Sequence, residues 1–179
     1  MGFDFVVKVS PFDEESEEPK LKHLSPKKFV EYLALEKAKS AIPQNPNSIL
    51  LTADTTVDLN GESIAKPKDL EDARQMLKKL SASTHYIYTS YVIVDTTSKR
   101  TFQKTAKSEV KFKQISNEEI DDYLKTAKVD DKAGAYAVQE EGKVFVESTK
   151  GDFLNIVGLP SSVKRDLEKF GIKPHLQEK

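Results

Sequence analysis

The sequence predicts an α/β fold in which helices flank one long, twisted, mixed β-sheet. Three observations support this prediction. Apolar residues recur at helical spacing in some segments, β-branched and alternating residues mark others, and the two kinds of segment are interspersed without an internal repeat. A chain of 179 residues can enclose one sizeable core, and no linker divides it. We therefore predict a single domain over residues 1–179.

Capping and breaking signals define the predicted helices. Ser25 and Pro26 place a hydroxyl cap and a first-turn proline before an apolar stripe. Asp69 is expected to cap a second helix, and Ser116 with Glu119 forms a capping box for a third. The predicted helices are residues 25–42, 69–80, 116–126 and 161–170.

The remaining regular segments are predicted to be strands. Asn60-Gly61 is a strong turn signal after the most apolar of them, and residues 96–99 join two others into a long hairpin. Residues 11–19 are expected to form an acidic loop, and residues 173–179 a frayed tail. The predicted strands are residues 3–9, 48–58, 84–95, 100–113 and 143–149.

Composition excludes several classes of protein. Lys and Arg number 28 against 29 Asp and Glu, so the basic excess that is typical of nucleic-acid binders is missing. The chain has no cysteine, which excludes disulfides and thiolate sites. No run approaches the ~18 apolar residues of a membrane span, and the first residues do not resemble a secretion signal. We expect a cytoplasmic protein without a membrane or nucleic-acid partner.

Two polar groups follow the apolar strand predicted at 48–58. Asp54 and Thr55 lie near its carboxyl end, where side chains often face a ligand; alternatively, Asp54 caps a turn. Lys66 precedes Pro67, which holds its backbone extended and would aim its ammonium at a phosphate. A solvated surface lysine is the other interpretation.

Three further segments carry unusual polar residues. Residues 130–139 combine adjacent carboxylates, small residues and Gln139, which suits a metal–phosphate site beside a base pocket or else an ordinary turn. Asn155 has apolar neighbours and must bond either backbone groups or a substrate. Residues 13–18 contain five carboxylates, which are either solvated or available to a hard cation such as Mg²⁺.

The order of these groups along the chain is informative. They are Asp13-Glu14, Lys37-Ala38, Ala53-Asp54-Thr55, Lys66-Pro67, Asp131 to Tyr136 with Gln139, and Asn155 to Pro160. In this order, and over nearly the whole chain, the sequence resembles the Maf-type nucleoside-triphosphate pyrophosphatases. The resemblance implies a Maf/Ham1-like fold with the active site in a cleft between two lobes. It also implies hydrolysis of nucleoside triphosphates to monophosphate and pyrophosphate, and a homodimer.

The resemblance implies a chemical role for five residues. Asp54 is expected to be the general base that activates water. Glu14 and Asp131 are expected around a divalent metal ion, Mg²⁺ or Mn²⁺. Lys37 and Lys66 are expected to hold phosphate oxygens, which explains a cation on the otherwise apolar helix stripe at 25–42.

Three further residues are expected to contact the substrate. Thr55 and Gln139 match positions tied to substrate choice in this family, and Asn155 belongs to its last motif. A glutamine at position 139 resembles the branch of the family that acts on dTTP and UTP. An amide both donates and accepts hydrogen bonds, as recognition of a pyrimidine edge requires.

One segment of the family has no counterpart. The family opens with a strand followed by Ser-x-Ser-Pro-Arg-Arg, whereas residues 1–5 match the part after that loop. We therefore expect a domain that is truncated at its N-terminus relative to the family, with the natural start upstream of Met1. The alternatives are a catalytically impaired nucleotide-binding relative and an interaction protein associated with septum formation.

Overall fold

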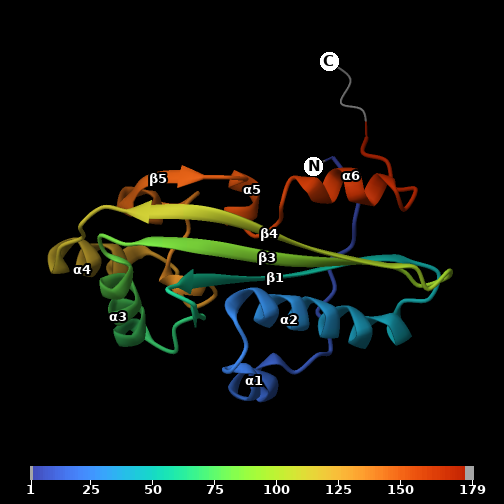
Figure 1. Ribbon diagram of the computed structural model, residues 1–179, viewed down its shortest axis with the longest axis horizontal. Helices are drawn as coiled ribbons and strands as arrows, with labels where there is room; N and C mark the ends of the chain where they lie inside the picture. Colours follow the sequence, from blue (N-terminus) through green and yellow to red (C-terminus); the bar gives the residue numbers. More distant parts are fainter. Residues whose placement is uncertain (1, 176–179) are drawn as a thin grey trace.

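The computed structural model describes residues 2–175, which build one twisted five-stranded sheet between two layers of helices (Figure 1). The strand order is β2-β1-β3-β4-β5, and all neighbouring strands are antiparallel. The predicted α/β class and long sheet are confirmed, but the sheet is antiparallel and not mixed: turns join β1 to β2 and β3 to β4, and the strands on either side of α3 and α4 also enter the sheet antiparallel to their neighbours. The strands are β1 (Ile49–Leu59), β2 (Glu62–Ile64), β3 (Thr84–Asp95), β4 (Thr101–Phe112) and β5 (Val146–Lys150).

Most helix boundaries agree with the sequence signals. Asp69 accepts a hydrogen bond from Asp72 N and caps α3, and Ser116 and Glu119 form the complete capping box of α4. Ser25 precedes α2, although its side chain makes no capping bond. The helices are α1 (Glu14–Glu17), α2 (Pro26–Ala41), α3 (Leu70–Leu80), α4 (Asn117–Thr126), α5 (Phe153–Ile156) and α6 (Ser162–Glu168).

Two short segments differ from the prediction. The expected acidic loop contains α1 and a 3-10 turn over Glu18–Leu21, because Asp13 caps Ser16 N and the acidic residues of the first turn favour a helix N-terminus. The strand expected at 143–149 begins only at Val146, after a 3-10 turn over Glu141–Phe145.

Helices cover both faces of the sheet. On one face α2 buries Ala34 and Ala38 against Val92 and Val94 of β3. On the other face α6 packs Val163 and its neighbours against the alternate side chains of β3. The largest apolar cluster lies at the end of the sheet where α3 and α4 pack (Figure 1). Between residues 2 and 175, no helix is both long enough and apolar enough to cross a bilayer.

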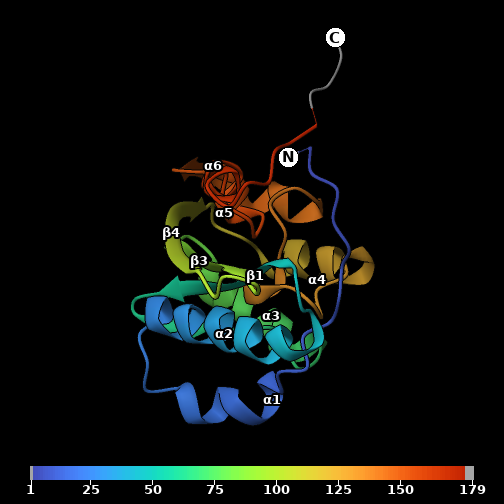
Figure 2. The same ribbon diagram turned by 90° about the vertical axis from the view of Figure 1, so that its right-hand side faces the viewer.

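The strand predicted at residues 3–9 does not form. The segment is extended but runs across the β1 side of the sheet, from the α6 face to the α2 face (Figure 2). There Ser10 donates a hydrogen bond of 3.2 Å to the Lys37 carbonyl. Alternating apolar residues favour an extended backbone, but a strand also needs a partner aligned along its length. Residues 3–9 have none because they cross the sheet direction.

The last described residue, His175, contacts the N-terminal segment. His175 N donates to the Gly2 carbonyl at 2.6 Å, and its ring contacts Asp4. Residues 176–179 of the predicted frayed tail lie outside the described residues.

Strand β1 has a free outer edge near its middle. β2 pairs only with Val57–Leu59, and no other described strand lies on that side. Successive side chains of a strand point to opposite faces, so Asp54 faces α2 whereas Thr55 faces α5. A pocket at this edge therefore receives side chains from both faces of the sheet.

Candidate active site

A cavity of about 320 Å³ opens at the free edge of β1. It is bounded by the middle of β1, by Lys66 after β2, by the loop over residues 131–139 and by residues 156–158 after α5. Asp54, Lys66, Asp131 and Gln139 all line it, although 85 residues separate the first from the last. With Thr55, five of the eight expected site residues line this cavity, whereas Glu14, Lys37 and Asn155 are not among its lining residues.

Asp54 belongs to an ion-pair network on the α2 side, with Lys37 at its centre. Lys37 Nζ lies 2.6 Å from Asp54 Oδ1 and 2.9 Å from Glu14 Oε1. The Lys37 and Asp54 side chains are only 15% and 11% exposed. The amphipathic stripe of α2 places Lys37 over β1, so this buried cation is matched by two carboxylates.

Burial and charge act on these groups in opposite directions. Burial raises the pKa of Asp54 to about 6, against the opposing effect of Lys37. Burial lowers the pKa of Lys37, but Asp54 and Glu14 outweigh it and hold that pKa above its ordinary value. At neutral pH, Asp54 is therefore an ionised carboxylate that is able to take up a proton.

Lys66 and Asp131 form the opposite wall. The Lys66 side chain is exposed, and its charge acts on both Asp54 and Asp131. Lys132 Nζ lies 2.8 Å from Asp131 Oδ1, and this bond lowers the pKa of Asp131. The wall therefore presents two cations and one ionised carboxylate to the cavity.

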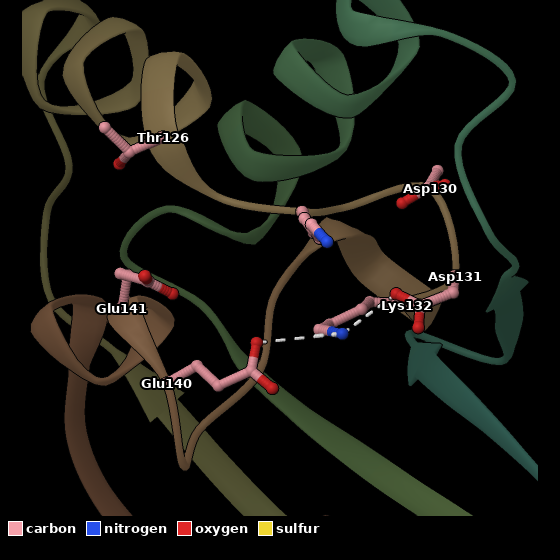
Figure 3. A pocket seen from close by; sticks show the side chains of 7 residues that line it. Thr126, Asp130, Asp131, Lys132, Glu140 and Glu141 are labelled. Carbon is pink, nitrogen blue, oxygen red and sulfur yellow. Dashed lines mark hydrogen bonds and ion pairs between the residues drawn. The ribbon is translucent and has the colours of Figure 1, made fainter.

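Lys132 also faces a second, more open hollow of about 690 Å³. Its ammonium lies between Asp131 and Glu140, at 3.7 Å from the Glu140 carboxylate (Figure 3). Asp131 and Lys132 line both spaces, so the outer hollow adjoins the smaller cavity at this point. The residues around the outer hollow are Thr126, Lys128, Asp130, Asp131, Lys132, Glu140 and Glu141.

The loop that carries Gln139 is fixed by contacts with the core. Gly134 has a φ of +73°, and a Cβ there would meet a Val57 methyl group at 3.1 Å. Tyr136 OH lies 2.6 Å from Nε2 of the fully buried His85. Gln139 itself is exposed and lines the cavity.

Asn155 lies behind the cavity and does not line it. The residue is fully buried, and its Nδ2 donates to the Ile87 carbonyl at 3.1 Å and to Ser108 Oγ at 2.9 Å. These bonds join α5 to β3 and β4. The geometry favours the interpretation in which Asn155 bonds protein groups and positions residues 156–158.

Comparisons with known proteins identify the family of this chain. The family model described as "Maf-like protein" matches residues 1–169. The chain belongs to the Maf family. A protein named dTTP/UTP pyrophosphatase from Acholeplasma laidlawii is 42% identical over 151 residues, which are 84% of this chain and 78% of the relative. The protein of that name from Bacillus pumilus is 37% identical over 174 residues, 97% of this chain and 89% of the relative.

An archaeal protein shows similar likeness. The dTTP/UTP pyrophosphatase of Pyrococcus horikoshii is 39% identical over 142 residues, which cover 79% of this chain and 75% of the relative. The fold expected from the Maf resemblance is therefore shared with proteins from distant organisms.

Three residues in or behind the candidate site received no role from the sequence. Lys132 follows Asp131 within the motif, and its position beside a carboxylate was the available signal. Thr89 and His85 contact Thr55 and Tyr136 from β3. No local pattern marks either one, because both contacts depend on strand register and tertiary packing.

The carboxylates fit a metal ion only in part. Among residues 2–175, no three Asp, Glu or His side chains converge into a ready-made metal site. Glu14 and Asp54 both contact Lys37 Nζ, so their carboxylates lie on the same part of the α2 side. Mg²⁺ typically takes one or two carboxylates and completes its shell with phosphate oxygens and water. This donor set therefore fits an ion that arrives with a triphosphate.

Proposed function

We propose that this Maf chain hydrolyses the α–β anhydride of dTTP or UTP, releasing the nucleoside monophosphate and pyrophosphate. One observation carries the proposal: Asp54, Lys66, Asp131 and Gln139 line one cavity. A proton acceptor, a phosphate-binding cation and an amide that is able to bond a nucleobase are thereby close enough to contact one ligand. The names of the relatives support the choice of substrate.

Asp54 is proposed as the general base. Its carboxylate accepts a proton from water as the water oxygen forms a bond to a phosphorus of the α–β anhydride. The bond from that phosphorus to the leaving oxygen breaks, and the leaving phosphate group departs with the electron pair. Lys37 fixes the orientation of the carboxylate through the 2.6 Å contact and keeps it ionised near neutral pH.

Lys66 and Lys132 are proposed to bind phosphate oxygens. Their ammonium groups offset the negative charge that phosphoryl transfer spreads over these oxygens. Glu14 and Asp131 would contribute oxygens to Mg²⁺ or Mn²⁺ beside the substrate phosphates, and a bound divalent ion would supply further charge neutralisation. Gln139 is proposed to bond the pyrimidine edge. The homodimer and the cytoplasmic location expected from the resemblance stay predictions.

A pyrophosphate-release assay tests this function. The chain is incubated with UTP, dTTP, CTP, ATP or GTP, with Mg²⁺ or Mn²⁺, and pyrophosphate and monophosphate are measured together. We expect equal amounts of both products, and fastest release from UTP and dTTP. Calorimetric binding of UTP without pyrophosphate release would favour the catalytically impaired relative instead. Neither binding nor release would overturn the proposed function.

A further inference from the structure

A chain of hydrogen bonds leads from the cavity into the protein interior. Register places Thr55 of β1 opposite Thr89 of β3, and their hydroxyl oxygens lie 2.9 Å apart. Thr55 lines the cavity, whereas Thr89 is fully buried. Behind Thr89, its Oγ1 lies 3.1 Å from the backbone carbonyl of Asn155.

The chemistry of these groups fixes the direction of the chain. A carbonyl oxygen only accepts, and a hydroxyl has a single proton. The Thr89 proton is therefore used on the Asn155 carbonyl. In the bond between the two hydroxyls, Thr55 must then be the donor and Thr89 the acceptor. The Thr55 proton points inward, and only lone pairs of Thr55 Oγ1 remain for a ligand.

The carbonyl at the end of the chain is held in place. It also accepts a hydrogen bond of 3.0 Å from Gly158 N, and the buried Asn155 side chain anchors the residue to Ile87 and Ser108. Gly158 has a φ of +106°, and a Cβ there would reach Thr55 Oγ1 only at 3.7 Å, an ordinary van der Waals distance. Both Thr55 and Gly158 line the cavity.

We propose that Thr89 is a positioning residue that makes Thr55 an obligate acceptor and thereby selects a nucleobase with a ring N–H. Uracil and thymine offer such a donor at N3, whereas cytosine has an acceptor there. Two acceptors facing each other leave both unpaired, which disfavours cytosine by about 10- to 100-fold. The inference rests on the proposed function. It adds that the direction of the Thr55–Thr89 hydrogen bond determines which nucleobase the site prefers.

A ribose hydroxyl is another donor that Thr55 is able to bond. UTP and CTP have the same ribose and differ only in the base, so their ratio separates the two cases. A sugar contact changes the values for both nucleotides equally and leaves the ratio unchanged.

The test compares kcat/KM for UTP and CTP, and Kd for UMP and CMP, in four proteins. Thr89→Val removes the acceptor with little change in shape, and the Asn155 carbonyl keeps its bond to Gly158 N. Thr89→Ser retains the hydroxyl. Thr56→Val makes the same chemical change on the opposite face, at a buried hydroxyl without a partner among the described residues. Thermal melting checks that each variant folds.

We expect the wild type, Thr89→Ser and Thr56→Val to prefer the uracil nucleotide by at least about 10-fold. In Thr89→Val the freed Thr55 hydroxyl is able to turn its proton toward cytosine N3, so the preference falls to within about 3-fold of unity. A Thr89→Val protein that keeps the wild-type ratio overturns this inference and leaves the proposed function standing.

Two other outcomes are decisive. If Thr89→Val does not fold, Thr55→Val is measured in its place. An unchanged ratio of uracil to cytosine nucleotide in that variant overturns the inference, because Thr55 then does not distinguish the two nucleobases. A wild-type chain that binds neither UMP nor CMP and releases no pyrophosphate overturns the proposed function, and this inference with it.

Discussion

Lys37 Nζ lies 2.6 Å from Asp54 Oδ1, and the helix α2 that carries Lys37 is packed directly against the sheet that carries Asp54. Burial and this contact together set the pKa of the proposed base. Burial raises the pKa of the carboxyl to about 6, and Lys37 keeps it from rising further. The pKa of this proton acceptor is therefore close to the pH at which it must act, as efficient proton transfer requires.

The pH dependence of activity follows from this pair. We expect kcat/KM for UTP to fall on the acid side with an apparent pKa near 6, since protonated Asp54 cannot accept a proton. Lys37→Gln removes the opposing cation, so the acid limb moves to higher pH. Initial rates between pH 5 and 9 measure both curves. A limb that moves to lower pH in the variant would exclude this role for Lys37.

Stability should depend on pH through the same group. The pKa of Asp54 is higher in the folded protein than its ordinary 3.8, so the protonated form stabilises the fold below about pH 4. That contribution is lost as pH rises through about 6. Between pH 4 and 7 the wild type therefore loses at most about 3 kcal/mol of unfolding free energy that Asp54→Asn, which has no carboxyl to titrate, does not lose. The difference between the variant and the wild type rises by that amount. Urea titrations measure it, and Thr56→Val, which removes no titratable group, should show a constant difference.

Lys132 and Lys128 offer a matched pair of cations. Lys132 lines the inner cavity, whereas Lys128 lines only the outer hollow. Lys132→Gln should weaken UTP binding about 10-fold, because a charge-assisted bond to phosphate is lost. Lys128→Gln should change Kd less than about 2-fold, as is usual for an exposed charge. Calorimetry checks both, and equal losses would mean that the triphosphate occupies the outer hollow.

Gly142 is required by close packing under the Gln139 loop. A Cβ at this position would lie 2.7 Å from the Ala137 carbonyl and 2.9 Å from Ala137 N, so the backbone has to shift. We expect Gly142→Ala to destabilise the protein by about 1–3 kcal/mol and to weaken the preference for UTP by displacing Gln139. A variant with wild-type melting temperature and selectivity would show that the loop adapts without cost.

Local signals in the sequence predicted local structure well. The capping residues Asp69 and Ser116 begin α3 and α4, and the polar residues 96–99 connect β3 and β4 as expected. These features depend on neighbouring residues, which the sequence displays directly. Residues 3–9 show the limit, because their strand-like alternation says nothing about whether a partner strand lies alongside.

The site was predictable only as a set of motifs. The sequence indicated that Asp54, Lys66, Asp131 and Gln139 belong together, and the fold places them around one cavity. The strand predicted at 48–58 already implies that the adjacent residues Asp54 and Thr55 face opposite sides. The sequence did not indicate that Thr89 lies behind Thr55, because that pairing arises from strand register, which single-sequence patterns do not encode.

The central claim is that Asp54, at the free edge of β1, is the base that activates water. The most direct measurement is pyrophosphate release from UTP by Asp54→Asn, beside Asp58→Asn on the same strand and face. Asp58→Asn retains an oxygen for its bond to Gly61 N and should keep wild-type turnover. Asp54→Asn should remain folded, bind UMP, and lose at least about 100-fold in kcat. Wild-type turnover by folded Asp54→Asn would contradict the account.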